Sequence, residues 1–353
     1  MTLPTPRPTP PPIALPTGLP ACPKHMTYGP CGGVGAGGAC EVGTMRCVFL
    51  DGPVVAWSGG PGAGEVDAPG RELLAIAARR PLVLSGMPAA PLSAESIVEC
   101  SAPLRGAVDA VLAGDAATSR VQFPPAYRAA LIRAQGLRVW AGLNCRDRNR
   151  VALEAEIAAL AHAGAAAVHC VTGDHTLSGL RPEAMPVFDL EGTELVPLAR
   201  SAGLLVSVAE SPNAPPVAHR AARLAEKARA GAHLAMLQYC GEAADVAAFA
   251  TAVRDAGAHV PLIPGVPVVV DRPGAELLAS FAGAALLAGF VERVLTAADP
   301  YAAGVEVALA YARELVDVEG VAGVLLGGGA APGSEPLLAT AFAEIGRELG
   351  GGT

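Results

Sequence analysis

The sequence has few aromatic and few charged residues, and it contains no long uninterrupted apolar run. Aromatic side chains make up 4% of the 353 residues, the net charge is -8, and the 25 Lys and Arg residues form no basic cluster. Nucleic acid is therefore not expected as the main partner, because single strands need aromatic stacking platforms and duplexes need basic surfaces. No apolar run reaches the roughly 20 residues of a membrane-spanning helix, so no membrane partner is expected either.

The first residues of the chain lack the features of an export signal. Residues 1–20 contain repeated prolines and no continuous apolar stretch, which predicts a disordered, polyproline-like leader. We therefore expect a cytoplasmic protein, in which structural disulfides are rare.

Half of the eight cysteines lie in one short segment that follows this leader. Glycines and a proline separate them, so the segment can fold back on itself until the four thiolates meet at one point. Four thiolates suit zinc, which would then be structural, or an iron–sulfur cluster. The spacing is not the common C-x2-C form, and disulfides or free thiols are the alternatives. We predict that residues 21–57 form a metal-binding domain whose ligands are Cys22, Cys31, Cys40 and Cys47.

Beyond a glycine-rich linker at residues 58–74, short apolar strands alternate with alanine-rich amphipathic helices. Eight such units predict a (β/α)8 barrel, also called a TIM barrel, over residues 75–349. A doubly wound open sheet is the competing α/β architecture, and periodicity alone does not exclude it. Two or three helices between the last two strands would elaborate the seventh unit. The expected strands are residues 81–85, 108–113, 138–143, 166–171, 204–208, 232–238, 260–264 and 321–326.

Barrel sites form at the carboxyl ends of the strands, so polar residues at those ends are the candidates for function. The third strand runs into Asn144-Cys145-Arg146-Asp147-Arg148-Asn149-Arg150, where Asp147 or Asn149 is also suited to cap the next helix. The fourth strand ends in Thr172-Gly173-Asp174, where a helix cap is again the alternative for the carboxylate. The sixth ends at Gln238, whose amide offers a donor beside an acceptor.

Histidines and glycines near these ends give further candidates. His175 follows Asp174 and is a candidate proton carrier, whereas His169 lies inside a strand and is expected to be a core residue. The stretch 33–38 fits G-x-G-x-x-G but lacks the strand before and the helix after it, so no dinucleotide site is expected there. Gly327 and Gly328 follow the last strand, where many barrels bind phosphate, and are the predicted cofactor-binding residues, with a simple turn as the alternative.

Together these motifs resemble the methylenetetrahydrofolate reductase family over residues 78–349. The run from Leu143 to Arg150 is similar to that family's third-strand motif, and Thr172-Gly173-Asp174 is similar to its fourth. The segment from Lys227 to Gln238 resembles its sixth, and Pro264-Gly265-Val266 its seventh. The cysteine run, C-P-K-x-M-x-x-G-P-C-G-G, resembles a four-cysteine domain that accompanies such reductases or their partner subunits.

The resemblance implies a role in one-carbon metabolism, namely reduction of 5,10-methylenetetrahydrofolate to 5-methyltetrahydrofolate with NAD(P)H as the hydride source. It implies that Asp174 and Gln238 hold the pterin ring. A carboxylate accepts two parallel hydrogen bonds from the amino-pyrimidine edge, and a glutamine amide pairs with the remaining donor and acceptor. Opening the methylene bridge also requires an acid. Further substrate contacts are expected from Arg146, Asp147, Asn149 and Thr172.

The sequence departs from the family pattern at the acid and at the flavin contacts. The first strand reads Val83-Leu84-Ser85-Gly86-Met87-Pro88, without the family's acidic glutamate, so Asp115 and His175 are the candidate replacements. Gly142 and Ala113 stand where a histidine and a threonine are usual, so FAD is not the expected cofactor.

Two functions remain open on these grounds. One is a flavin-free reductase that takes hydride directly from the nicotinamide. The alternative is a non-reducing folate-binding partner subunit or a folate-dependent methyl-transfer protein. A partner subunit and a homo-oligomer are both compatible with the sequence.

Overall fold

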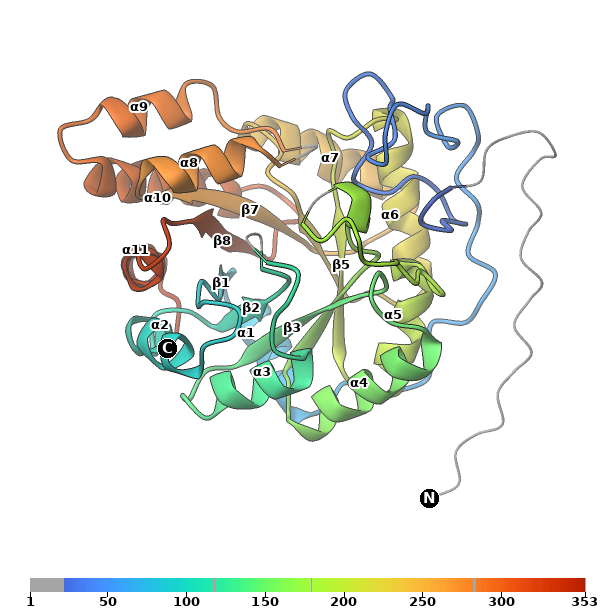
Figure 1. Ribbon diagram of the computed structural model, residues 1–353, viewed down its shortest axis with the longest axis horizontal. Coiled ribbons are helices and arrows are strands. Elements are labelled where there is room, and N and C mark those ends of the chain that lie inside the picture. The colour runs from blue at the N-terminus through green and yellow to red at the C-terminus, as the bar shows by residue number, and fades with distance from the viewer. Residues whose placement is uncertain (1–21, 117–118, 179, 282–283, 353) are drawn as a thin grey trace.

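Eight parallel strands close into a barrel in the computed structural model of the chain (Figure 1). The last strand pairs with the first, with Leu82 opposite Gly323 and Ser85 opposite Leu326. The structure describes residues 22–116, 119–178, 180–281 and 284–352, so the predicted leader lies outside the described residues. The closed ring confirms the predicted (β/α)8 barrel and excludes the open sheet.

All eight predicted strands are present, and their ends differ from the predicted ends by at most a few residues. The strands are β1 (Leu82–Gly86), β2 (Ala110–Ala113), β3 (Val139–Asn144), β4 (Ala167–Val171), β5 (Leu205–Glu210), β6 (Leu234–Leu237), β7 (Leu262–Val269) and β8 (Gly323–Gly329). The last two run further toward the rim than the sequence pattern predicts, so Gly327 and Gly328 belong to β8 and do not follow it.

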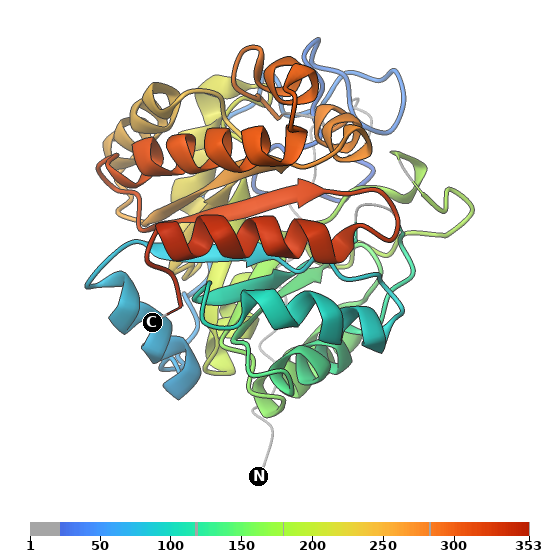
Figure 2. The same cartoon turned by 90° about the vertical axis from the view of Figure 1, so that its left-hand side faces the viewer.

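Helices surround the strands on the outside (Figure 2). Two or three helices are predicted between β7 and β8, and α8, α9 and α10 are present there, which confirms the elaboration of the seventh unit. None of the described helices is both long and apolar enough to cross a bilayer. The helices are α1 (Ala68–Ala77), α2 (Ala94–Leu104), α3 (Pro125–Arg133), α4 (Arg150–His162), α5 (Gly192–Ser201), α6 (Arg220–Arg229), α7 (Ala243–Asp255), α8 (Arg272–Ala279), α9 (Phe290–Thr296), α10 (Pro300–Val316) and α11 (Glu335–Glu348), with short 3-10 turns η1 (Thr176–Ser178) and η2 (Val217–His219).

Helix α1 closes the amino-terminal end of the barrel. Its Leu73 and Ile76 join the apolar cluster that fills the barrel interior, together with Leu84 of β1 and Trp140 of β3. The helix begins at Asp67, whose carboxylate accepts a hydrogen bond from Gly70 N at 3.2 Å. No helix is predicted here from the sequence, because the first seven of its ten residues fall in the stretch assigned to the linker.

Three polar side chains are linked inside the barrel. Trp140 Nε1 donates to Ser207 Oγ at 2.9 Å, and Ser207 Oγ lies 2.8 Å from His169 Nδ1. The indole can only donate, so Ser207 Oγ accepts from Trp140 and is at the same time the hydrogen-bond partner of His169 Nδ1. Burial, with a smaller contribution from Lys227, lowers the pKa of His169 to about 4. His169 is therefore a neutral core residue, as predicted.

This buried histidine makes stability depend on pH. Its pKa in the folded protein lies below the value of about 6.5 for an unfolded histidine, so between these values the unfolded chain binds the extra proton. We expect the free energy of unfolding to fall as the pH drops from about 6.5 toward 4, and His169→Gln to reduce this slope by up to about 1.4 kcal/mol per pH unit. Urea unfolding at several pH values measures the slope. His259→Gln, at an exposed position, is the control; equal slopes in both variants would contradict the assignment.

Candidate functional site

The cysteine segment (residues 22–57) packs on the barrel beside the carboxyl ends of β4 and β5 and against α6 (Figure 1). Its backbone and side chains meet several charged residues of the barrel, most of them buried. Arg220 donates from Nη1 to Pro30 O at 3.3 Å and from Nη2 to Cys31 O at 3.0 Å. At the end of the segment, Trp57 N donates to Glu226 Oε2 at 2.7 Å. The segment therefore forms a wall of the barrel rim.

Glu191 is the centre of this contact. Its side chain is fully buried and accepts hydrogen bonds from Thr27 N at 2.8 Å, Tyr28 N at 3.2 Å and Arg223 Nη2 at 2.5 Å. Burial works to raise the pKa of Glu191, but Arg223 and the hydrogen bonds outweigh it and hold the pKa below the usual value. Glu191 thus stays ionised and joins the cysteine segment to the start of α5.

A second carboxylate comes from the cysteine segment itself. Glu41 pairs with Lys24 at 2.7 Å, and both side chains are almost fully buried. Its Oε1 also accepts hydrogen bonds from the barrel, from His175 N at 2.6 Å and from Ser178 Oγ at 3.4 Å. Glu41 therefore contacts the rim directly after Asp174.

Three of the four predicted metal ligands take part in a small apolar core. Cys47 is buried with Met26, Val34 and Phe49, and Cys22 and Cys31 pack against this cluster. Burial is the largest effect on the Cys22 thiol and raises its pKa to about 11, so this thiol remains protonated in the arrangement described.

The donor arrangement does not fit a metal. No set of three or more His, Cys, Asp or Glu side chains among the described residues is placed to hold an ion. The four cysteines, Cys22, Cys31, Cys40 and Cys47, carry free thiols, so the disulfide alternative is absent as well. A metal-binding domain is thus unsupported, and the physical reason is that Cys22, Cys31 and Cys47 pack as apolar groups. Zinc or an iron–sulfur cluster stays a prediction, which metal analysis of the purified protein would test.

At the ends of β2 and β3 the structure brings together several of the predicted polar residues. Asp115 accepts from Asn144 Nδ2 at 3.0 Å, from Arg146 Nη2 at 3.0 Å and from Gln122 Nε2 at 3.0 Å. Arg146 is buried and also binds Asp147 through Nε at 2.8 Å and Nη2 at 2.7 Å. With three donors directed at it, Asp115 acts as an acceptor that orders this rim, and it does not present a proton to a ligand.

Two of the predicted substrate contacts have structural partners. Asn149 caps α4, with its Oδ1 accepting from Ala152 N at 3.0 Å, so the helix-cap alternative holds for this residue. Thr172 Oγ1 accepts from Gly192 N at 3.0 Å and ties the end of β4 to the start of α5.

Asp174 and Gln238 lie at the carboxyl ends of β4 and β6, as predicted. The side chain of Asp174 is 68% exposed and forms one ion pair, 3.5 Å from Arg120 Nη2. It does not cap the next long helix, because α5 begins at Gly192 and has Glu191 at its cap position. Gln238 is half-buried, and its Oε1 accepts from Tyr239 N at 3.1 Å.

His175 is placed less favourably for proton transfer. Its Nδ1 accepts from Leu177 N at 3.1 Å, and its ring stacks on Phe188 with centroids 5.7 Å apart. The residue is 5% exposed, and burial lowers the pKa of its imidazole although Glu41 acts in the opposite direction. Its geometry is that of a packed neutral histidine.

The predicted phosphate site at Gly327 and Gly328 lies within the strand pairing. Gly327 is opposite Pro267 and Gly328 is opposite Val268 of β7. A Cβ atom on Gly327 would lie 2.6 Å from the hydroxyl of Tyr239, and one on Gly328 would lie 2.3 Å from Val268 O. Close packing explains both glycines without a phosphate.

Flavin fits poorly at β3 and along α6. At Gly142, the position of the expected histidine, a Cβ atom would lie 2.7 Å from Gly114 Cα, so no side chain has room there. Arg220 is committed to Ala214 O, Pro215 O and the carbonyls of the cysteine segment. Lys227 binds Glu210 Oε2 at 2.7 Å. The cations of this side are used within the chain, and we derive no step through a flavin.

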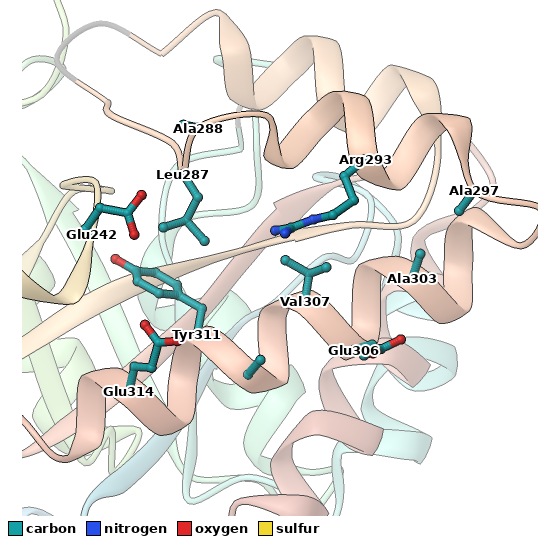
Figure 3. Close-up of a pocket in the computed structure, with 11 residues that line it drawn as sticks. Glu242, Leu287, Ala288, Arg293, Ala297, Ala303, Glu306, Val307, Tyr311 and Glu314 are labelled. Atoms are coloured by element: carbon teal, nitrogen blue, oxygen red, sulfur yellow. The ribbon is translucent and has the colours of Figure 1, made fainter.

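A cavity of about 490 Å³ lies away from the barrel mouth, between α9, α10 and the start of α7 (Figure 3). Glu242, Arg293 and Glu306 surround it, and Tyr311 and Val307 of α10 point toward it. No predicted site residue lines it, so we place the reaction site at the mouth.

The sequence analysis missed the charged residues that join the cysteine segment to the barrel. The missed residues are Lys24, Glu41, Glu191, Arg220 and Arg223. A signal was present for Lys24 and Glu41, because each lies within two residues of a cysteine in the predicted metal domain. No signal in one sequence showed that their partners are on the barrel.

The Glu191 contact gives a stability prediction. Glu191→Ala leaves Arg223 buried without its partner, and breaking such a buried pair costs about 3–5 kcal/mol. Glu154→Ala is the control, since the exposed pair with Arg150 at 3.2 Å contributes about 0.5 kcal/mol or less. Urea unfolding measures both variants, and a loss below about 1 kcal/mol for Glu191→Ala would contradict the role assigned to this contact.

Comparison with known proteins agrees with this architecture. No curated protein matches the chain. A family model described as methylenetetrahydrofolate reductase matches residues 113–325, which is more than half of the chain. The match runs from the last residue of β2 into β8 and includes Asp174 and Gln238, whereas β1 and the cysteine segment lie outside it. The chain therefore belongs to the methylenetetrahydrofolate reductase family.

Proposed function

We propose that this protein binds a reduced folate at the carboxyl end of its barrel and reduces 5,10-methylenetetrahydrofolate to 5-methyltetrahydrofolate, with NAD(P)H as the direct hydride donor. Family membership supports a folate-related function. The observation that carries the proposal is the placement of Asp174 and Gln238, which end β4 and β6 on the same rim of one closed barrel.

The two side chains have the groups that a pterin needs. The exposed Asp174 carboxylate has oxygen lone pairs left beside its ion pair with Arg120, and these accept from the amino-pyrimidine edge. The Gln238 amide supplies a donor next to an acceptor. At the end of β2 the rim has open space, since a Cβ atom on Gly114 would meet no atom within 4 Å.

Direct hydride transfer is favoured by the poor fit of a flavin. The reaction opens the bond between the methylene carbon and N10, N10 takes a proton, and hydride reduces the resulting iminium carbon to a methyl group. Asp174 and Gln238 orient the pterin for this transfer. Asp115 and His175 are both occupied by other hydrogen bonds, so we assign the proton to solvent at the exposed rim.

The second candidate is a folate-binding partner subunit or methyl-transfer protein that performs no reduction. It is favoured by the end of β1, where Ser85, Gly86 and Met87 stand without a carboxylate. Without a dedicated acid, a site that binds folate and leaves the methylene bridge intact is the simpler chemistry.

Anaerobic titration with methylenetetrahydrofolate, followed by NADH or NADPH, distinguishes the two candidates. Methyltetrahydrofolate formed without added flavin supports the reductase. Saturable binding without turnover supports the second candidate, and absence of binding would refute both.

Asp174→Asn provides the residue-level test. The change removes a charge-assisted acceptor, which contributes about 1.5–3 kcal/mol, so folate binding should weaken by about 10- to 100-fold with the fold intact. Glu183→Gln is the matched control, because this exposed carboxylate of the same loop pairs only with Arg181 among the described residues. Equal affinities of the two variants, measured by calorimetry, would remove Asp174 from the site.

A further inference from the structure

We propose that the cysteine segment is a positioning element of the folate site, in which Glu41 holds the turn that carries Asp174. This inference rests on the proposed function for its consequence, although the contact itself does not. It assigns to residues 22–57 a role that requires no metal. Glu41 is a positioning residue, because it acts on the ligand through Asp174.

Glu41 contacts the chain on the far side of the turn. The turn comprises Thr172, Gly173 and Asp174, and the next backbone amide belongs to His175. That amide donates to Glu41 Oε1 at 2.6 Å. The same oxygen accepts from Ser178 Oγ at 3.4 Å, so one carboxylate holds both the exit of the turn and the short helix η1.

The chain is also held on the near side of the turn, before Gly173. Thr172 Oγ1 accepts from Gly192 N at 3.0 Å, which fixes the entry of the turn to the start of α5. The preceding residue, Glu191, accepts from Thr27 N and Tyr28 N of the cysteine segment. The segment therefore holds the turn from both sides, through Glu41 after it and through Glu191 before it.

The Glu41 contact is built into the segment. Lys24 is 4% exposed and has its charge compensated by Glu41 at 2.7 Å, so the carboxylate is fixed in direction by a buried partner. A Cβ atom on Gly33 would lie 1.6 Å from Glu41 Oε2, and only glycine leaves the side chain its path to the barrel. An exposed carboxylate that is free to rotate would have neither a buried partner such as Lys24 nor a path kept open by a glycine.

The turn needs such support. Asp174 is mostly exposed, and its ion pair with Arg120 is long at 3.5 Å. Gly173 has a φ of +89°, a conformation that glycine adopts without the cost other residues have, so the turn has little rigidity of its own. A ligand that donates hydrogen bonds to the Asp174 carboxylate benefits when the carboxylate is already in place.

Hydrogen exchange on the full chain tests the contact without folate. In Glu41→Ala the amide of His175 should exchange at least about tenfold faster, the value expected for loss of a hydrogen bond to a charged group. The amide of Cys47, which donates to Gly38 O at 2.9 Å, should keep its rate and so report that the segment is still folded. Unchanged exchange at His175 would overturn the proposal.

Three further variants make this test specific. Glu41→Gln keeps an oxygen acceptor and should restore most of the protection at His175. Glu41→Asp keeps the charge beside Lys24 but shortens the reach, so it should expose the His175 amide even if Glu41→Ala does not fold. Asp51→Asn removes an exposed carboxylate of the same segment that pairs with Arg46, and it should change nothing at His175.

Folate affinity then tests the consequence for the site. Glu41→Ala should weaken binding about tenfold in the parent protein but cause no further loss in the Asp174→Asn background, because both changes act on the same interaction. Equal losses in the two backgrounds would overturn the positioning role. If the parent protein binds no folate, the proposed function fails, whereas exchange at His175 still decides whether Glu41 holds the turn.

Discussion

Buried carboxylates with more than one charged or polar partner hold the cysteine segment against the barrel, and the shape of the rim depends on them. Glu191 and Glu41 each accept from two chain segments that are more than a hundred residues apart in sequence. Removing water from such groups is costly, and it is offset only when every partner is in place. We therefore expect the cysteine segment and the barrel to fold as one cooperative unit, although the sequence composition divides them into two.

The barrel itself could be predicted from the sequence because its cause is local. Each strand is a short apolar run between helices with an apolar stripe, and the closed ring is the arrangement that buries eight such runs. The predicted strand ends are wrong where close packing, and not the apolar pattern of the sequence, decides where a strand stops. The sequence predicts that Gly327 and Gly328 follow β8, yet the strand continues through them. They are glycines because neighbouring atoms leave no room for side chains.

The sequence predicts a site residue only where the residue's position follows from the end of a predicted strand. Asp174 and Gln238 lie where strand order places them, since the carboxyl ends of parallel strands share one rim. The tasks of the other polar residues depend on partners that are distant in sequence. Asp115 is predicted as a replacement for the family's acid, but it accepts hydrogen bonds from Asn144 and Arg146 of the next strand and its loop. The sequence of one strand does not show which hydrogen-bond donors the neighbouring strand will place beside it.

The cysteine segment and the poor fit for flavin have a common physical basis. The guanidinium of Arg220 binds backbone carbonyls at Pro30 and Cys31, and Lys227 and Arg220 both contact Glu210. Burial works to raise the pKa of Glu210, but Lys227 and Arg220 outweigh it and keep it low, so the charges are balanced within the chain. A phosphate brought to these cations would have to displace both the carboxylate and the segment. On the proposed function, a barrel that uses its cations to hold its own wall takes hydride from a donor that enters from another side of the rim, at the end of β2, where a Cβ atom on Gly114 would meet no atom within 4 Å.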